Sequence, residues 1–149
     1  MKKFKFRLQT LLRVKEHIEK QHQKELAEAT QQVLRQVKEL EAISHKSENT
    51  LEAKRQKQTN NVSVAELLVY SRYLLKLRRD NLAGRELMSA LQTNERKKRK
   101  KLLEASREKK VYEKLKEHDQ ERFNNDAEAM AHKEADEIGL NIYRLRQKQ

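Results

Sequence analysis

The segment Thr59-Asn60-Asn61-Val62-Ser63 decides the fold, because it is the one stretch whose composition indicates a turn. The chain has no proline, and its two glycines, Gly84 and Gly139, lie far from this segment. A backbone with so few turn residues favours long helices, because strands and compact α/β units need frequent Gly, Pro, Asn or Asp. Ser63 followed by Glu66 is a capping box, which is typical of a helix start. We therefore expect one helix to end before Thr59 and a second helix to begin just after Ser63.

The expected fold is all-α, with two long helices in an antiparallel coiled-coil hairpin and one short turn near residues 59–63. The first helix would span about residues 4–58 and the second about residues 64–138, with an extension to residue 145 left open. At a rise of about 1.5 Å per residue, these helices would be about 80 and 110 Å long. We expect residues 1–149 to form a single, monomeric hairpin.

Each expected helix carries a seam of residues at alternating intervals of three and four, which is typical of a left-handed coiled coil. The seam of the second helix comprises Leu67, Tyr70, Leu74, Leu77, Asn81, Gly84, Met88, Leu91, Glu95, Lys98, Leu102, Ala105, Lys109, Tyr112, Lys116, Asp119 and Phe123. The seam of the first helix comprises Leu26, Thr30, Val33, Val37, Leu40, Ser44, Ser47 and Leu51. We expect Ile43 to lie outside this seam.

An antiparallel register follows from the position of the turn. A turn centred on Asn61 places residues 19–25, where the first helix loses its apolar seam, opposite residues 96–103, where the second helix is also polar. The same register places Phe4 near His118, so that the last part of the second helix has no partner within the chain. The coincidence of the two polar stretches favours a hairpin over two separate helices.

The composition excludes a globular core and favours anionic partners. Charged residues make up 39% of the chain and aromatic residues 5%, which suffices for a narrow seam only. The absence of cysteine excludes disulfides and thiolate metal sites, and no apolar run is long enough for a membrane span or a signal peptide. We expect a soluble, cytoplasmic protein. The net charge of +12 favours nucleic acid, an acidic membrane surface or an acidic protein patch as a partner.

We expect no enzyme, no cofactor and no metal site. The five histidines are not paired at helical spacing with each other or with a carboxylate cluster, and they are His17, His22, His45, His118 and His132. No phosphate-binding glycine loop and no nucleophile with a base can be assembled from the sequence. A two-helix hairpin also offers no concave pocket that excludes water.

Two surface features are candidates for binding. The first is a basic patch of six consecutive residues, Arg96, Lys97, Lys98, Arg99, Lys100 and Lys101. It could bind nucleic acid, or it could be a solvated segment neutralised in part across the hairpin by Glu16, Glu19, Glu25 and Glu28. Its place in the middle of a hairpin argues against a DNA-reading basic region, so we expect no specific nucleic-acid recognition.

The second feature is an excess of apolar residues near the turn. Val69 and Tyr73 flank one side of the seam, and Leu68, Leu75 and Leu82 flank the other. These residues could pack a wide hairpin tip or support self-association. Exposed Tyr and Leu clusters with charged rims are also typical of docking surfaces.

Several segments resemble the flagellar export protein family FliJ. They are the opening stretch Phe4-Lys5-Phe6-Arg7-Leu8-Gln9-Thr10-Leu11-Leu12-Arg13, the stretch Glu25-Leu26-Ala27-Glu28-Ala29, the stretch Lys110-Val111-Tyr112-Glu113-Lys114-Leu115-Lys116-Glu117 and the stretch Ala135-Asp136-Glu137-Ile138. Their order, their spacing, the length of the chain and the single turn agree with that family, and the resemblance covers nearly the whole chain.

The resemblance implies a small antiparallel coiled coil similar to the stalk of the rotary ATPase gamma subunit. Such a protein enters the central hole of the hexameric flagellar export ATPase, promotes ring formation and links the ring to the membrane export gate. Some members are also described as escorting export chaperones. The implied location is cytoplasmic, with peripheral association with the inner membrane at the flagellar base. This chain is far shorter than the gamma stalk and has no globular domain.

On this resemblance, two sets of residues are expected contacts. The contacts with the ATPase ring would be the paired ends, namely Phe4, Leu8, Leu11, Leu12, Tyr112, Leu115 and Phe123. The contacts with the export gate would lie near the turn, namely Ile43, Val69, Tyr73, Leu75 and Leu77.

Two other hypotheses stay open at this point. One is a basic coiled-coil protein that associates with nucleic acid or the ribosome, and the other is a generic dimerising scaffold with no ATPase partner. The salt dependence of binding distinguishes the nucleic-acid hypothesis from the stalk hypothesis, because phosphate binding through residues 96–101 would weaken steeply with salt concentration.

Overall fold

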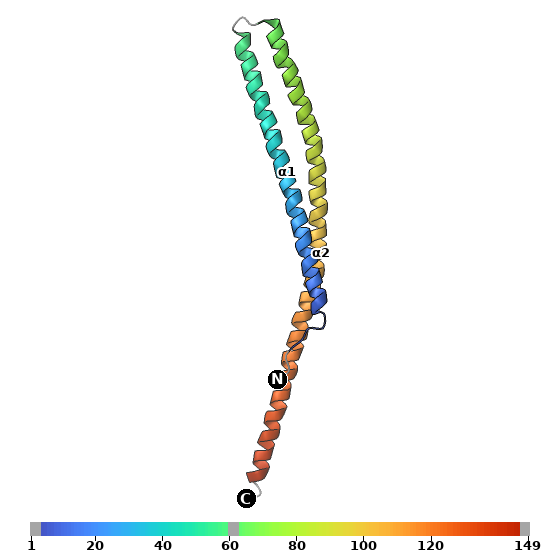
Figure 1. The fold of residues 1–149 in the computed structure, drawn as a ribbon. Coiled ribbons are helices and arrows are strands. Elements are labelled where there is room, and N and C mark those ends of the chain that lie inside the picture. The colour runs from blue at the N-terminus through green and yellow to red at the C-terminus, as the bar shows by residue number, and fades with distance from the viewer. Residues whose placement is uncertain (1–3, 60–62, 147–149) are drawn as a thin grey trace. The chain divides into compact units, whose positions relative to one another are not determined.

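The computed structural model describes residues 4–59 and 63–146, with side chains described to residue 144. Two helices account for nearly all of these residues, α1 (Gln9–Gln58) and α2 (Val64–Arg146), and the described residues contain no strand (Figure 1). The expected all-α hairpin of two long helices is therefore confirmed. The middle of the expected turn, residues 60–62, lies outside the described residues.

Both helix ends at the turn fall where the sequence predicts them. The backbone N–H of Glu66 donates to Ser63 Oγ at 3.3 Å, so Ser63 caps the start of α2. Glu66 is the acidic residue in the first turn of α2, where a negative charge suits the helix dipole. At the other side of the turn, Thr59 Oγ1 donates to the carbonyl oxygen of Gln56 at 2.7 Å. These local bonds satisfy backbone groups that each helix end would otherwise leave unpaired.

The expected helix start at Phe4 is wrong, and α2 is longer than its minimum expected span. Residues 4–8 precede α1, and the N–H of Gln9 donates to the Phe6 carbonyl in a turn that leads into the helix. This non-helical entry lets the Phe6 side chain fold onto the hairpin, where it is buried. At the other end, α2 continues past residue 138 to Arg146 and passes through Gly139.

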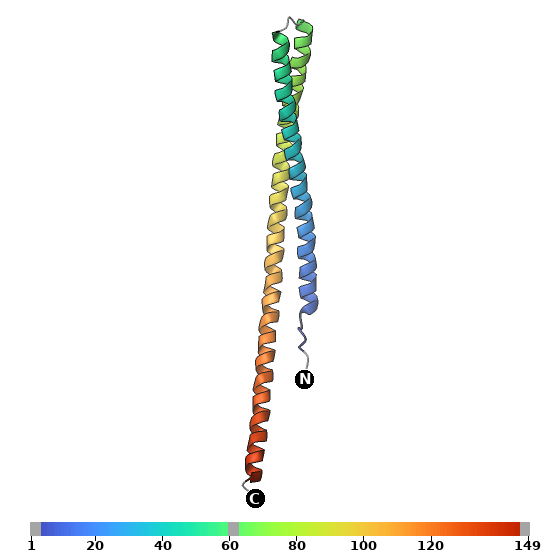
Figure 2. The same ribbon diagram turned by 90° about the vertical axis from the view of Figure 1, so that its left-hand side faces the viewer.

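The chain divides into two compact units. One unit comprises residues 20–103, which include the turn, and the other combines residues 1–19 with residues 104–149. Within residues 20–103, the α1 and α2 segments lie side by side and run in opposite directions (Figures 1 and 2). Each unit is therefore built from one segment of α1 and one segment of α2.

In the unit of residues 20–103, the predicted α2 seam is confirmed at every position from Leu67 to Leu102, since all are at least half-buried. The predicted α1 seam is right up to Leu40, but it is wrong at Ser44 and Leu51, which are exposed. Ile43 and Thr50 take their places in the seam. The seam takes a step of three residues after Leu40, because burying the larger apolar side chain of Ile43 removes more apolar surface from water than burying Ser44 would.

The two helices approach closely at Gly84. A Cβ atom at this position would lie 2.7 Å from Leu40 Cδ2, so a larger side chain would force Leu40 to move. Gln36 is buried beside it and its Nε2 donates to the Gly84 carbonyl at 3.1 Å. The missing side chain of Gly84 thus makes room for Leu40 and for a hydrogen bond from a buried amide, which would be costly without a partner.

In the unit of residues 1–19 and 104–149, the buried residues are Phe6, Leu12 and Ala105. The predicted seam holds here too, except that Asp119 is exposed and Gln120 is half-buried instead. Here Phe4 packs on Phe123, with ring centroids 5.7 Å apart.

The predicted position of Phe4 near His118 is therefore wrong by about one helical turn. Residues 4–6 are not helical and precede a turn at residues 7 and 8, and extended backbone rises about 3.3 Å per residue against about 1.5 Å in a helix. This segment therefore reaches farther along α2 than a helix would. Beyond Phe123, every described side chain of α2 to Arg144 is exposed, so the described part of α1 does not bury this stretch, as expected.

Candidate interaction sites

The open end, defined as residues 4–12 with residues 112–123, gathers the predicted ring contacts. Its members differ in exposure. Leu12 is buried at 3% exposure, whereas Leu11 and Leu115 are exposed at 45% and 44%. The remaining predicted contacts, Phe4, Leu8, Tyr112 and Phe123, are half-buried. Leu11 and Leu115 can thus touch a partner directly, while the other residues hold the two segments together.

A shallow hollow of about 390 Å³ lies at the open end. It is lined by Leu12, Glu16, Glu113, Lys116, Glu117 and Gln120. Three carboxylates around one lysine make the hollow acidic. Within the described residues no group of three or more His, Cys, Asp or Glu side chains is arranged to hold a metal ion.

Ion pairs across the hairpin continue the seam where apolar residues are few. Lys109 Nζ lies 2.9 Å from Glu19 Oε2 and 3.4 Å from Glu113 Oε1, and Lys15 Nζ lies 2.6 Å from Glu108 Oε2. The hydrogen bond from Lys109 holds the pKa of Glu19 below its ordinary value, and the bond to Glu19 raises the pKa of Lys109. In the same way, the bond to Glu108 raises the pKa of Lys15. The charges therefore favour the antiparallel pairing of these segments.

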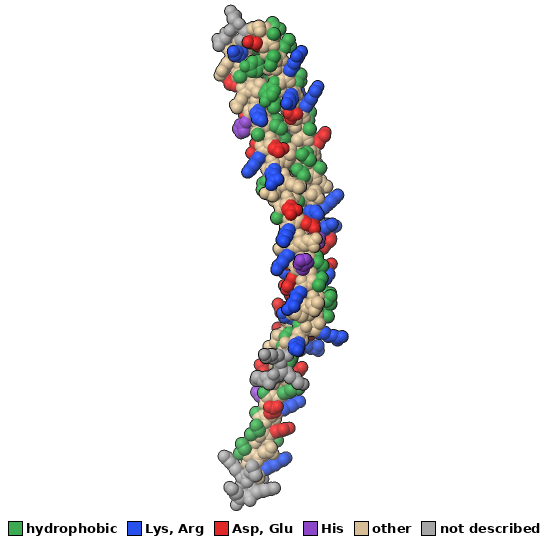
Figure 3. Space-filling model, viewed as in Figure 1, with side chains coloured by type: hydrophobic (Ala, Val, Ile, Leu, Met, Phe, Trp, Pro, Cys, Tyr) green, Lys and Arg blue, Asp and Glu red, His purple; other side chains and the backbone are tan. Residues whose placement is uncertain are grey.

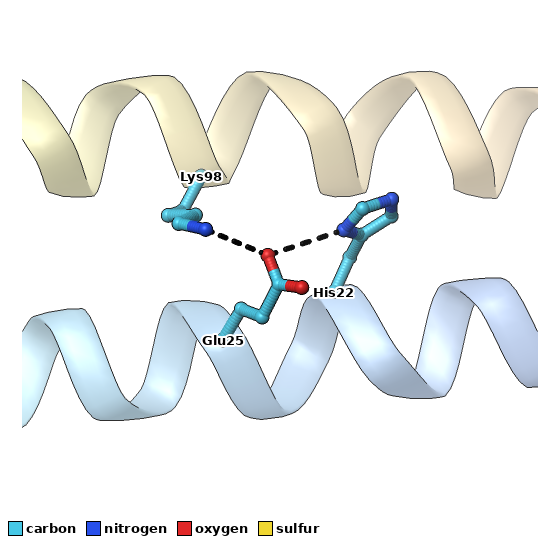
Figure 4. Close-up of polar contacts among 3 residues, drawn as sticks. All are labelled: His22, Glu25 and Lys98. Atoms are coloured by element: carbon cyan, nitrogen blue, oxygen red, sulfur yellow. Dashed lines mark hydrogen bonds and ion pairs between the residues drawn. The ribbon is translucent and has the colours of Figure 1, made fainter.

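A similar cluster lies in the unit of residues 20–103. Glu25 Oε2 is 2.8 Å from Lys98 Nζ and 3.6 Å from His22 Nδ1 (Figure 4). The Lys98 bond is the main cause that lowers the pKa of Glu25. This contact agrees with the expected register at Glu25, whereas Glu19 pairs with Lys109, beyond residues 96–103. The α1 stretch that was expected to lose its seam instead continues it with half-buried Glu25 and His22.

The basic patch of residues 96–101 is only partly neutralised. Lys98 pairs with Glu25, and Arg99 pairs with Glu95 on its own helix at 3.0 Å. Among the described residues, Glu25 is the one of the four expected carboxylates that pairs with the patch, and Glu19 pairs with Lys109 instead. The other four cations of the patch are exposed and form no ion pair with another described residue, and they are Arg96, Lys97, Lys100 and Lys101.

The turn-end patch lies in the unit of residues 20–103. Of the predicted gate contacts, Val69, Tyr73 and Leu75 are exposed, Ile43 is half-buried and Leu77 is buried at 4%. Figure 3 shows hydrophobic side chains on the surface near this end of the helices. We define the turn-end patch as the exposed residues Val64, Leu68, Val69, Tyr73, Leu75 and Leu82.

A groove of about 490 Å³ adjoins the patch. Leu77 and Ile43 contribute to its lining although neither is fully exposed, and Arg78 and Arg85 add positive charge. Sequence reasoning missed the two arginines, although their interval of seven residues places them on one face of a helix. The groove is lined by Ile43, Ser44, Ser47, Leu74, Leu77, Arg78, Asn81, Leu82 and Arg85.

A model of the family described as flagellar FliJ protein matches residues 4–148. The chain belongs to the FliJ family. As a family member it is a component of the flagellar export apparatus, and the FliJ family is a non-catalytic part of that apparatus. No curated protein and no solved structure matches the chain. Over the described residues, neither helix of this FliJ-family chain has a segment long and apolar enough to cross a membrane.

Proposed function

We propose that the chain is a non-enzymatic stalk that inserts into the hexameric export ATPase ring and links it to the membrane export gate. Family membership places the chain in the flagellar export apparatus, and one structural observation supports the stalk function. Among the described residues, the segment that precedes α1 packs on α2 as far as the contact of Phe4 with Phe123, and α2 then continues to Arg146 with its described side chains exposed. A helix that extends beyond the helix it pairs with is suited to insertion into a surrounding ring.

The open end is the proposed ring contact. Its apolar residues Leu11 and Leu115 are exposed to water. Leaving apolar surface in water is unfavourable by about 25 cal/mol per Å², so a partner that covers it gains affinity. The buried and half-buried residues around them keep these two side chains on a fixed scaffold.

The turn-end patch is the proposed gate contact. It presents six large apolar side chains beside a groove with two arginines. Apolar clusters rimmed by charge are typical of protein interfaces. Binding there would hold the chain peripherally at the inner membrane, and the same surface offers a place for export chaperones.

The test exchanges exposed residues only, so that folding is preserved. Leu11→Ser with Leu115→Ser is compared with Val69→Ser with Leu75→Ser. We expect the first pair to lose stimulation of ring formation and ATPase turnover while keeping gate binding, and the second pair to do the reverse. Circular dichroism of both proteins should match the parent chain. If the first pair stimulates fully and the second does not, the assignment of the two ends is reversed.

The exposed cations of the basic patch favour a second candidate function, binding of nucleic acid or the ribosome. Arg96, Lys97, Lys100 and Lys101 are free to contact phosphates. Four such contacts would give a slope of log affinity against log salt of roughly −3.6 on duplex DNA. Absence of binding to duplex DNA and ribosomes at low salt excludes this candidate.

A further inference from the structure

Three leucines near the turn form a straight row on the outer surface of α2. Leu68, Leu75 and Leu82 follow one another at intervals of seven residues, and all three are more than half exposed. Seven residues make almost two full helical turns, so these side chains lie on one side of the helix. We call them the leucine row, which extends over about 21 Å at a rise of about 1.5 Å per residue. The row lies outside the seam, and α1 leaves it uncovered.

Arginines border the leucine row on both sides. At about 100° per residue, Arg72 and Arg79 lie along one edge of the row. Arg78 and Arg85 lie along the other edge, next to the seam. All four arginines are exposed, and none forms an ion pair with another described residue. Figure 3 shows Lys and Arg side chains among hydrophobic ones near this end of the helices.

Cations outnumber carboxylates on this side of the hairpin. The groove that adjoins the row is lined by two arginines and by no carboxylate. From α1, Lys54 adds a further cation, because its Nζ donates to Oγ of Ser71 on this side of α2 at 3.0 Å. Two carboxylates, Glu48 of α1 and Glu86 past the end of the row, lie on the same side, whereas Asp80 lies on the far side of α2.

An apolar row between two rows of arginines is complementary to a membrane surface that contains anionic lipids. Amphipathic helices with this pattern lie in the plane of the bilayer, with apolar side chains at the acyl boundary and cations at the headgroups. The guanidinium group binds phosphate through paired hydrogen bonds, and the long arginine side chain reaches the headgroups while leucine stays deeper. The row stands on the convex outer surface of the helix, which suits a flat layer. A second copy of the row does not fit, because the arginines of the two copies would repel each other.

We propose that the leucine row and its flanking arginines bind the surface of a membrane that contains anionic phospholipids. The leucine row is then the lipid-facing part of the turn-end patch. Val69 and Tyr73 lie about 120° and 160° around α2 from the centre of the row, so they stay available to the gate protein. Lipid binding of this kind goes beyond the stalk function, because it needs neither the ATPase ring nor the gate.

The leucine test measures flotation of the full chain with vesicles of phosphatidylglycerol and phosphatidylcholine in equal parts, or of phosphatidylcholine alone. We expect the parent chain to bind the anionic vesicles at low salt and the neutral vesicles at least about tenfold more weakly. Leu75→Ser with Leu82→Ser should weaken binding to the anionic vesicles by about tenfold or more, because it removes the apolar contact. The control is Val69→Ser with Leu87→Ser, which changes two exposed residues elsewhere around α2 and should bind within about twofold of the parent chain.

The charge test replaces the four flanking arginines by glutamine, as Arg72→Gln with Arg78→Gln, Arg79→Gln and Arg85→Gln. Binding to the anionic vesicles should fall by more than about tenfold, because each cation near an anionic surface adds to the attraction. The control makes the same change of net charge in the basic patch, as Arg96→Gln with Lys97→Gln, Lys100→Gln and Lys101→Gln. It should keep most of the binding, because the leucine row and its arginines are intact. Circular dichroism of all variants should match the parent chain.

Loss of vesicle binding in both row variants, with both controls close to the parent chain, is the expected result. No binding of the parent chain to anionic vesicles, or an equal loss in the basic-patch control, would overturn the membrane surface and leave the proposed function standing. Row variants that bind vesicles like the parent chain but no longer bind the gate protein would assign the row to a protein partner, which also overturns the proposal. A dimer of the parent chain without vesicles that Leu75→Ser with Leu82→Ser dissolves would show that a second copy covers the row, and it would likewise overturn the proposal.

Discussion

Gly84 shows how one residue sets the distance between the two helices in the unit of residues 20–103. Its missing side chain leaves room for Leu40 and lets Gln36 reach the Gly84 carbonyl. Glycine weakens a helix by about 1 kcal/mol relative to alanine, so it suits this position because of packing and not because of backbone preference. Gly139, in contrast, has nothing within 4 Å of its Cβ position.

The two glycines should therefore respond oppositely to substitution. Gly84→Val should destabilise the protein by about 1–3 kcal/mol, because the new methyl groups meet Leu40 in a packed seam. Gly139→Ala should raise helicity, with a gain of up to about 1 kcal/mol in local helix stability. Thermal unfolding and circular dichroism measure the two effects. A Gly84→Val protein as stable as the parent chain would contradict the close approach.

The seam carboxylates predict a specific dependence of stability on pH. The folded pKa values of Glu19 and Glu25 are lowered by Lys109 and Lys98, from an ordinary value of 4.5. A group with a lowered folded pKa contributes stability that is full above the ordinary value and is lost as pH falls through the folded pKa. The melting temperature should thus fall as the pH drops below about 4.5.

Glu19→Gln with Glu25→Gln removes these two titrating groups. Its melting temperature should be lower than that of the parent chain at neutral pH and should depend less on pH between neutrality and strong acid. Glu39→Gln with Glu41→Gln is the control, because both residues are exposed. Parallel pH curves for the parent chain and the seam variant would show that the two ion pairs add no net stability.

At the scale of elements, the sequence predicts α2 better than α1. The α2 seam keeps one register from Leu67 to Lys116, so its apolar positions and the Ser63 cap leave little ambiguity. In α1, steps of three or four after Leu40 both lead to plausible seams, and only the packing against α2 selects Ile43. The non-helical start could not be predicted either, because its reason is the burial of Phe6 against the hairpin.

The candidate sites were predictable as groups, but the expected gate contacts mixed residues of the predicted seam with residues of the surface. Leu75 and Leu77 are two positions apart on α2, yet Leu75 is 57% exposed and Leu77 is 4% exposed. Both were expected to contact the gate. The packing of the hairpin buries Leu77 and leaves Leu75 exposed to a partner. From the sequence alone, this difference in burial can be inferred only from a correctly placed seam.

These two leucines form a matched pair for testing the seam. Leu77→Ala should destabilise the protein by about 2–5 kcal/mol, because it removes a buried side chain. Leu75→Ala should change the free energy of unfolding by less than about 0.5 kcal/mol, because its side chain is on the surface. Chemical denaturation measures both. Similar losses in the two variants would place Leu75 in the core and remove it from the gate contact.

At the scale of the whole molecule, we expect the two units to bind different partners. The unit of residues 20–103 carries the turn-end patch, and the unit of residues 1–19 and 104–149 carries the open end. The family places the chain in the flagellar export apparatus. The division of partners between units is the central claim of the proposed stalk function.

Site-specific photo-crosslinking tests this claim most directly. A photoreactive residue is placed at Leu115 or at Val69, both of which are exposed, and the full chain is mixed with the export ATPase and the export gate protein together. We expect an ATPase adduct from position 115 and a gate adduct from position 69. A gate adduct from position 115 with an ATPase adduct from position 69 would contradict it.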